Sequence, residues 1–339
     1  MTPKISFAIG LMLLASPAFA TGVKTPAGGF AITNLVSDQA GVAQTTDPDL
    51  VNPWGISHIT GGPNWVSDNG TDKSTVYNRT NGAKSLTVNV VSAPTGTVAN
   101  SGGGFVISEN GRDGSAAFLF DTEAGTILGW SSSVDASNAV VAVDNSAKGS
   151  VYKGLALDST SKQLYTADFT NNRVQIYDSN FSLTKSFTDK SLPKRFAPFN
   201  VQMLGGKLYV AFAKRERGGS DEVAGKGLGY VDVFDTSGTL LTHLVANGKL
   251  NAPWGMTIAP ASFGSLGGAL LVGNFGDGKI NAYDATTGDY LGALKGADGK
   301  VLKIDGLWAV DSGPANNQIT FTAGPGDESH GLLGLITAN

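Results

Sequence analysis

Short stretches in which apolar and polar residues alternate recur along the chain and predict β-strands. The clearest set lies at residues 155–187. Residues 155–157 and 163–167 are rich in apolar side chains, residues 173–177 (Arg-Val-Gln-Ile-Tyr) alternate with a period of two, and residues 183–187 end the set. A period of two is typical of a strand with one buried face. These segments therefore predict a four-stranded antiparallel unit.

This unit recurs along the chain. Its first strand carries a motif, Pro-Trp-Gly, which stands at residues 53–55 and returns at residues 253–255. Consecutive copies lie roughly 50 residues apart, which is the length of one β-propeller blade. Weaker copies of the motif fall at residues 104–106, 153–155, 199–201 and 308–310. The sequence thus predicts an all-β, six-bladed β-propeller, with each first strand lining a central channel.

The last predicted blade lacks one strand. After residue 304 the pattern indicates only three strands, near residues 307–310, 319–322 and 332–336. Residues 30–36 form a strand-like segment ahead of the first blade. Because an unpaired sheet edge promotes aggregation, we expect this N-terminal strand to join the last blade and close the ring.

The first 20 residues have the features of a secretory signal peptide. Lys4 precedes an apolar run, and Ala18-Phe-Ala20 fits a cleavage site before Thr21. An uncleaved membrane anchor is the alternative, although the apolar run is short for a bilayer span. We expect an exported protein, periplasmic or extracellular, in which residues 21–339 form one propeller domain. The chain has no cysteine, so this domain must be stable without a disulfide.

Composition narrows the class of partner. The net charge is −4, and glycine accounts for 46 of 339 residues, in keeping with many tight turns. A mildly acidic chain argues against binding to nucleic acid, and we expect no membrane insertion of the mature protein. The expected state is a monomer whose partner is a small molecule or another protein.

Polar and aromatic residues gather at predicted strand ends on one face of the ring. In a propeller, the starts of the first strands and the ends of the second strands lie at the same mouth of the channel. Concave sites that combine polar groups with aromatic rings are typical of ligand binding. The predicted ligand site comprises Asn52, Trp54, Lys153, Asn200, Asn251, Trp254, Asp305, Trp308 and His330. Structural roles are the alternative, since amides cap backbone groups and tryptophans pack between blades.

Oxygen-bearing side chains of this face suggest a metal ion. Asp168 and Asp305 are the predicted metal ligands, and asparagines of the same face add the hard oxygen atoms that calcium prefers. Calcium is therefore the candidate cofactor. Zinc is disfavoured, because the chain has no cysteine and its histidines, His58, His243 and His330, are spread over the predicted blades 1, 4 and 6.

Two long loops reach the same mouth. Residues 214–227 carry charges of both signs, and residues 324–331 hold Asp327, Glu328 and His330. Such compositions are most often those of solvated surface loops. Ser-x-x-Lys matches fall on predicted strands or turns, whereas that chemistry needs both residues on one helical turn. No catalytic set can be assembled, so the sequence leaves open whether the protein is an enzyme.

Longer motifs stand at the predicted strand starts. They are Asn-Pro-Trp-Gly-Ile at 52–56, Phe-Ala-Pro-Phe-Asn at 196–200, Asn-Ala-Pro-Trp-Gly at 251–255, Asp-Gly-Leu-Trp at 305–308 and the segment 322–331. Together they resemble an uncharacterised family of exported bacterial six-bladed propellers, over about residues 30–336. The resemblance implies the fold and carries no activity.

Blade 3 shows a second, more distant resemblance. Its pattern at residues 164–177 is similar to NHL-type repeats and to the calcium-dependent lactonases of the gluconolactonase (SMP-30-like) superfamily. Asn52 stands where those lactonases place a glutamate in the first blade. We expect a ligand or partner to bind at the channel mouth; the alternative is a calcium-dependent, lactonase-like hydrolase acting there.

Overall fold

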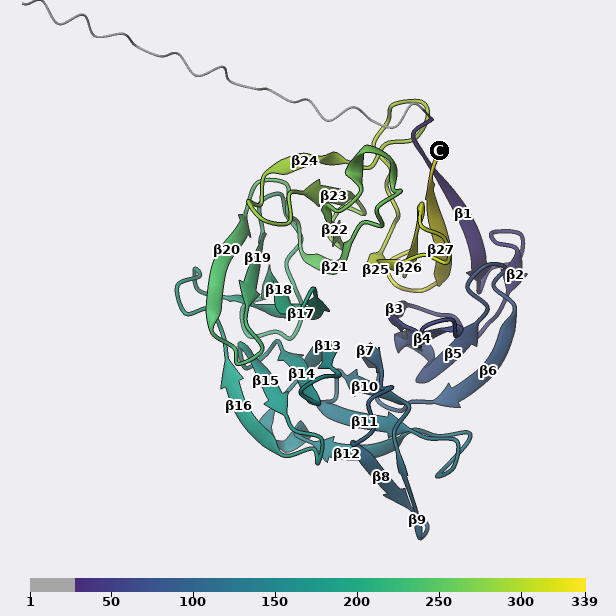
Figure 1. Ribbon diagram of the computed structural model, residues 1–339, viewed down its shortest axis with the longest axis vertical. Helices are drawn as coiled ribbons and strands as arrows, with labels where there is room; N and C mark the ends of the chain where they lie inside the picture. Colours follow the sequence, from purple (N-terminus) through teal and green to yellow (C-terminus); the bar gives the residue numbers. More distant parts are fainter. Residues whose placement is uncertain (1–27) are drawn as a thin grey trace, which may run out of the picture.

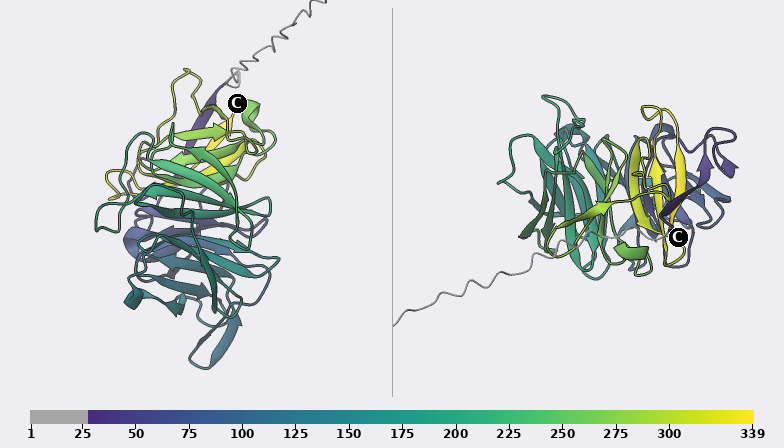
Figure 2. Two further views of the ribbon diagram at one scale, coloured as in Figure 1. Left: turned by 90° about the vertical axis from the view of Figure 1, so that its left-hand side faces the viewer. Right: turned by 90° about the horizontal axis from the view of Figure 1, so that it is seen from above.

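The computed structural model describes residues 28–339, in which six antiparallel sheets surround a central channel (Figure 1). The predicted all-β, six-bladed propeller is confirmed. The side views show the strands crossing the thickness of the ring (Figure 2). Helical segments among these residues are limited to three short 3-10 turns, and none is long and apolar enough to cross a membrane. The predicted signal peptide, residues 1–20, lies outside the described residues.

Each blade runs from an inner strand at the channel to an outer strand at the rim. Blades 1 to 5 consist, from inside outward, of β3 (Pro53–Ser57), β4 (Asn64–Asp68), β5 (Lys73–Tyr77) and β6 (Lys84–Asn89); β7 (Pro94–Ala99), β10 (Phe118–Thr122), β11 (Thr126–Trp130) and β12 (Val140–Asp144); β13 (Tyr152–Asp158), β14 (Gln163–Asp168), β15 (Arg173–Tyr177) and β16 (Leu183–Phe187); β17 (Phe196–Leu204), β18 (Lys207–Lys214), β19 (Gly229–Phe234) and β20 (Leu240–Ala246); and β21 (Pro253–Ile258), β22 (Leu270–Asn274), β23 (Ile280–Tyr283) and β24 (Tyr290–Ala293).

Blade 3 shows how far the alternating pattern reports burial. The predicted strands at 173–177 and 183–187 coincide with β15 and β16. The prediction of one buried face for β15 is wrong, because its polar residue Gln175 is as fully buried as its neighbours Val174 and Ile176. Neighbouring blades cover both faces of a blade, so only an outer strand such as β16 faces solvent.

Blade 6 closes the ring as the sequence predicts. It consists of β25 (Leu307–Ser312), β26 (Gln318–Ala323) and β27 (Leu332–Ala338), and the N-terminal β1 (Phe30–Ser37) pairs antiparallel with β27. A two-residue strand, β2 (Thr45–Thr46), extends the sheet beyond β1.

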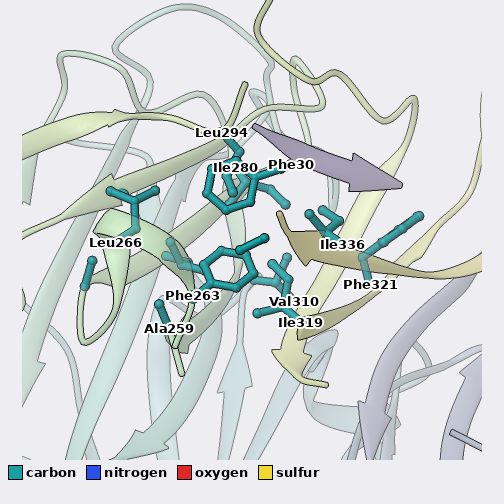
Figure 3. Close-up of a cluster of buried hydrophobic side chains, with 14 of the residues drawn as sticks. Phe30, Ala259, Phe263, Leu266, Ile280, Leu294, Val310, Ile319, Phe321 and Ile336 are labelled. Atoms are coloured by element: carbon teal, nitrogen blue, oxygen red, sulfur yellow. The ribbon is translucent and has the colours of Figure 1, made fainter. Parts of the chain in front are cut away.

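The hydrophobic cluster beside this seam joins the two ends of the chain (Figure 3). Phe30 of β1 packs on Phe263 with 4.9 Å between ring centroids, and the same cluster includes Phe321 and Ile336 of blade 6. Removing β1 would therefore open both a strand edge and this core.

Glycines of the inner strands allow the blades to meet at a narrow channel. A Cβ added to Gly55 would lie 2.6 Å from the carbonyl oxygen of Thr95 in the next inner strand, and one added to Gly255 would lie 2.5 Å from that of Trp308. Both distances are too short for a side chain. The glycine of the repeated Trp-Gly motif is thus required by contact between neighbouring inner strands.

Blade 2 departs from the predicted register. Its inner strand is β7, which carries Gly96, rather than the segment at residues 104–106. A hairpin of β8 (Val106–Glu109) and β9 (Arg112–Ser115) is inserted after β7 and projects from the ring (Figure 1). Phe105 belongs to this insertion and fills the hydrophobic core between blades 2 and 3. An apolar residue before the hairpin therefore gave the pattern of a first strand.

Candidate functional site

The starts of the inner strands surround a cavity of about 380 Å³ at one end of the channel. Its lining residues are Trp54, Glu123, Lys153, Asp221, Glu222, Trp308 and Glu328. We call this cavity the Lys153 mouth. Trp54, Lys153 and Trp308 come from first strands, and the carboxylates come from the loops that follow second strands.

Stacked aromatic rings form the base of the Lys153 mouth. Trp54 and Trp308 stack with ring centroids 3.6 Å apart, and Phe275 stacks on the other side of Trp308 at 4.1 Å. Trp254 meets both indoles edge-on. These rings come from blades 1, 5 and 6, so their packing ties the inner strands together.

The indole N–H groups of the three tryptophans have different partners. Trp308 donates to Asn52 Oδ1 at 2.9 Å, and Trp254 donates to the backbone carbonyl of Lys153 at 2.7 Å. Trp54 Nε1 is buried and has no hydrogen-bond partner among residues 28–339. Trp54 therefore has an unused donor at the cavity lining. A buried donor without a partner is costly, so a ligand that accepts from it would gain free energy.

Lys153 is the only cation that lines the cavity, and only 2% of its side chain is exposed. Its ammonium lies 2.8 Å from Glu123 Oε1, 3.3 Å from Asp221 Oδ1 and 5.0 Å from the centre of the Trp54 ring. Burial alone would lower the pKa of Lys153. The charges of Glu123, Glu222 and Asp221 outweigh that effect and raise the pKa, so the ammonium is charged at neutral pH.

The carboxyl groups of the mouth outnumber the ammonium four to one. Burial, opposed by Lys153 and reinforced by Glu328, raises the pKa of Glu222 to about 7. Burial also raises the pKa of Glu328, although Asn52 Nδ2 donates to its carboxylate at 2.7 Å. The site therefore holds two carboxyl groups with raised pKa values, of which Glu222 titrates at about 7, beside a fixed positive charge.

The middle of the channel is almost filled. The cavity there measures about 30 Å³ and is lined mainly by inner-strand residues such as Gly55, Gly96, Leu155 and Gly255. This is room for about one water molecule. A second cavity of about 220 Å³ opens at the other end of the channel, beside His58 and Asp311. A ligand larger than water can therefore enter only from the two ends.

The structure divides the predicted ligand residues into two groups. Trp54, Lys153 and Trp308 line the Lys153 mouth, and Asn52 binds Glu328 and Trp308 at its edge. Trp254 packs against those tryptophans and lines the small central cavity instead. The remaining four do not line the mouth: they are Asn200, Asn251, Asp305 and His330.

Each of these four residues has a local partner. Asn200 Nδ2 donates to the carbonyl of Trp254 at 2.8 Å and so joins blades 4 and 5. Asn251 Oδ1 accepts from the backbone of Gly225 at 2.6 Å. The two loop-side residues are also engaged: Asp305 Oδ2 accepts from the Gly326 amide at 2.9 Å, and His330 Nδ1 lies 2.8 Å from Asp38 Oδ2.

The residues predicted as calcium ligands do not fit that ion in this structure. The Asp168 carboxylate is buried and accepts hydrogen bonds from Ser150, Asn171 and Arg173, which leaves it paired with a cation of its own blade. Asp305 is exposed. Calcium needs six to eight converging oxygen atoms, whereas these two carboxylates belong to different local networks. Calcium as a cofactor stays a prediction.

Sequence reasoning missed the four carboxylates of the mouth. Glu123 follows β10 by one residue, in the place where Asn69 follows β4, and Asn69 Nδ2 donates to it at 3.0 Å. The strand-end prediction selected Asp168, the last residue of β14, one position before the place that Glu123 occupies after β10. Glu222 and Glu328 lie in the two long loops, which composition alone described as solvated.

Comparison with known proteins identifies relatives without an assigned activity. No family model matches the chain. The uncharacterized protein R648 of Acanthamoeba polyphaga mimivirus is 34% identical over 323 residues, covering 90% of this chain and 79% of that protein. Uncharacterized protein L690 of the same virus is 33% identical over 324 residues, covering 90% and 85%. The chain belongs to the same family as these two mimivirus proteins.

Solved structures with the same fold include enzymes. A streptogramin B lyase has a TM-score of 0.55 at 10% identity and covers 92% of this chain and 98% of its own. A catalytically inactive virginiamycin B lyase from Staphylococcus aureus with quinupristin has a TM-score of 0.54 at 12% identity over 91% and 98%. A luciferin-regenerating enzyme has a TM-score of 0.58 at 15% identity over 91% and 95%. At these identities the likeness establishes the fold.

Proposed function

We propose that the protein binds a small organic cation, such as an alkyl amine or a guanidinium compound, at the Lys153 mouth. The observation that carries this proposal is the excess of carboxylates over a single ammonium in a concave site with a tryptophan base. The volume of about 380 Å³ lies within the roughly 300–1,000 Å³ that small-molecule sites occupy.

The charges of the mouth favour a positive ligand. Lys153 is paired with Glu123 and Asp221, which leaves the Glu222 and Glu328 carboxyl groups without a cation of their own. A positively charged group placed beside them would regain the electrostatic energy that burial costs them. Trp54 and Trp308 add apolar contact where they line the cavity, since their ring faces are already covered by each other, by Phe275 and by the Lys153 ammonium.

In this proposal Lys153 does not bind the ligand; its ammonium determines where in the mouth a ligand cation can lie. Its buried ammonium neutralises one side of the mouth and is fixed over the Trp54 ring. A ligand cation avoids that side and is directed toward Glu222 and Glu328. The site would therefore discriminate by the position of the positive group as well as by its charge.

Titration calorimetry with spermidine and agmatine tests the proposal, with tryptophan fluorescence as a second readout. Succinate, an anion of similar size, and CaCl₂ serve as alternative probes. We expect binding of an amine that weakens at least about tenfold in Glu328→Gln and in Glu222→Gln, since each removes one carboxylate. Glu216→Gln, in the same loop as Glu222 but exposed and outside the cavity, is the matched control. Binding of succinate in place of the amines would overturn the proposal.

The second candidate is an enzyme that uses the same mouth for acid–base catalysis. Its support is the Glu222 carboxyl group, whose pKa of about 7 suits proton transfer at neutral pH, beside an ammonium that stays charged. The solved propellers named above are enzymes. A calcium-dependent, lactonase-like hydrolase is the metal-assisted form of this candidate.

A panel of lactones and esters, assayed with CaCl₂ and with EDTA, separates these candidates. Acid–base catalysis predicts turnover with a pH midpoint near 7 that Glu222→Gln abolishes. A requirement for calcium would favour the metal-assisted hydrolase. Amine binding without turnover of any panel member would leave the binding function alone.

Export is also a proposal. It rests on the signal-like residues 1–20, with cleavage after Ala20. Fractionation of expressing bacteria, followed by N-terminal sequencing, tests it. A mature protein that starts at Thr21 in the periplasm or medium is expected, and retention of an intact N-terminus in the cytosol would contradict it.

A further inference from the structure

We propose a second site, independent of the Lys153 mouth, in which Asp189, Asp232 and His243 bind a divalent transition-metal ion at the outer edge of blade 4. These three side chains present ligand atoms that all lie within 4.8 Å of one another. Among residues 28–339, no other group of three or more His, Asp or Glu side chains is arranged in this way.

The fold positions each of the three side chains. Asp232 stands in β19, directly opposite His243 in the outer strand β20, beside an irregularity in the strand pairing. Side chains opposite each other in an antiparallel pair are close enough to share a ligand. Asp189 comes from the connection between blades 3 and 4, where Ser191 donates from its amide at 2.8 Å and from its hydroxyl at 3.0 Å to the carboxylate.

The spacing of the ligand atoms matches a metal centre. His243 Nδ1 lies 3.1 Å from Asp232 Oδ1 and 3.3 Å from Asp189 Oδ2. Bonds of about 2.0–2.1 Å in a tetrahedral arrangement place two ligand atoms roughly 3.3 Å apart. A small ion could therefore bind with little movement of the side chains.

The charge of the cluster also calls for a cation. The carboxyl groups of Asp189 and Asp232 are 3% and 0% exposed, and both face the imidazole of His243. Asp232 Oδ2 is buried and has no hydrogen-bond partner among the described residues. Two buried carboxylates with an unpaired oxygen carry a desolvation cost that one imidazole does not offset. A divalent ion would neutralise both carboxylates, including the Asp232 group that carries the unpaired oxygen.

The other two histidines provide a comparison within the same chain. His58 lies 3.3 Å from Asp311, and His330 lies 2.8 Å from Asp38, so each of these histidines pairs with a single carboxylate. The carboxylates of these pairs are partly exposed, at 30% for Asp311 and 13% for Asp38. The second, buried carboxylate distinguishes His243.

The ligand set indicates the kind of ion. One imidazole nitrogen and two carboxylate oxygens suit Zn²⁺ and other first-row divalent ions, whereas calcium prefers six to eight oxygens. Three protein ligands leave a coordination position open to solvent. The half-exposed His243 ring, at 50%, gives an ion access from outside the ring of blades.

Titration of the full chain, after dialysis against chelator, with ZnCl₂ and with CoCl₂ tests this site. We expect one strong Zn²⁺ site per chain, a rise in Tm with zinc, and a visible Co²⁺ absorption band. His243→Gln removes a metal ligand itself. Loss of a residue that only hydrogen-bonds to a ligand weakens metal binding roughly 10- to 100-fold, so this variant should weaken Zn²⁺ binding by more than that. His58→Gln, which removes a histidine paired with one carboxylate, should bind zinc as the parent does.

Two further results decide the proposal. Asp232→Asn keeps the shape of the side chain and should also lose the site; should that variant not fold, the exposed His243→Gln still tests the claim. Equal zinc binding in the parent and in His243→Gln would overturn the proposal, as would the absence of both a Zn²⁺-dependent Tm shift and a Co²⁺ band. The cluster would then be an ion pair only.

Discussion

The two ends of the channel are built from the same six inner strands but differ in chemistry. At the Lys153 mouth, a buried ammonium, four carboxyl groups and stacked indoles surround the cavity. The opposite end is lined mostly by short or uncharged side chains such as Ser57, Thr97 and Ala156, with His58 and Asp311 as its ionisable pair.

The loops explain this difference. First and second strands are joined at the opposite end; in blade 4 the turn is only Gly205 and Gly206, between β17 and β18, and the longer insertion of blade 2 folds into the β8–β9 hairpin that projects from the ring. Second and third strands are joined at the Lys153 mouth, where the connections after β18 and β26 are long enough to carry Glu222 and Glu328 into the channel. The charged groups therefore gather at the end of the channel that these two long loops reach.

The largest effect is expected from Lys153→Met. The change removes the single cation of the mouth and leaves Glu123 and its neighbours uncompensated, so the free energy of unfolding at pH 7 should fall by about 3 kcal/mol. Urea unfolding measures this loss. Lys279→Met, which breaks a pair with Asp277 that is one-third exposed, should cost less than about 1 kcal/mol. Equal losses of unfolding free energy in the two variants would show that burial does not make the Lys153 ion pairs more important for stability than the exposed pair.

The next largest effect is expected from Asn52→Gly. Asn52 has a φ of +46°, which glycine accepts, so the change removes the side-chain hydrogen bonds to Trp308, Glu328 and Asn69 without backbone strain. Leaving the buried indole N–H unpaired should cost roughly 2 kcal/mol. Asn247→Gly, at a φ of +52° on an exposed turn, is the control and should change stability by less than about 0.5 kcal/mol. Thermal and urea unfolding of both variants check the difference.

The pH dependence of stability should also distinguish the Lys153 mouth from the opposite end of the channel. The pKa of Glu222 is raised from about 4.5 to about 7 in the folded protein, so the folded state holds more protons than the unfolded state between these values. Stability from this group is present below pH 4.5 and is lost as the pH rises through 7. Glu222→Gln should flatten that part of the stability profile, whereas Glu216→Gln should not. An unchanged profile in Glu222→Gln would contradict the raised pKa.

The smallest effect is expected at the opposite end. His58→Gln breaks the contact with Asp311, and pairs of this exposure contribute roughly 0–1 kcal/mol. Amine binding at the Lys153 mouth should be unchanged in this variant, since the cavity in the middle of the channel, between the two ends, measures only about 30 Å³. A change in amine affinity would show that the two ends are coupled, which calorimetry on this variant would detect.

The ring and its closure were predictable from the sequence because they depend on repetition and on strand period. The Trp-Gly motif recurs because inner strands touch, and residues 30–36 had to pair with a last blade that lacked a strand. The third-strand turns also follow local rules: Asp178 and Asp284 accept amide hydrogen bonds two to four residues ahead, as Asx turns do.

The candidate site was only partly predictable, for physical reasons. The polar character of Asn200 and its place near a predicted strand start make it a candidate ligand group, yet its amide donates to the backbone carbonyl of Trp254 and joins two blades. Glu222 and Glu328 were missed because loop composition does not reveal where a loop folds. Zinc was disfavoured because the histidines are dispersed, but the partners of His243 are aspartates from another strand and another connection.

The seam between β1 and β27 has a consequence for synthesis of the chain. Ribosomes make β1 about 300 residues before its partner β27, so the ring cannot close until β27 has been synthesised. Until then β1 is an unpaired strand and the Phe30 side chain lacks its place in the cluster of Phe263 and Ile336. Closure of the ring is thereby tied to synthesis of β27, and a chain that terminates before β27 is left with an open sheet edge.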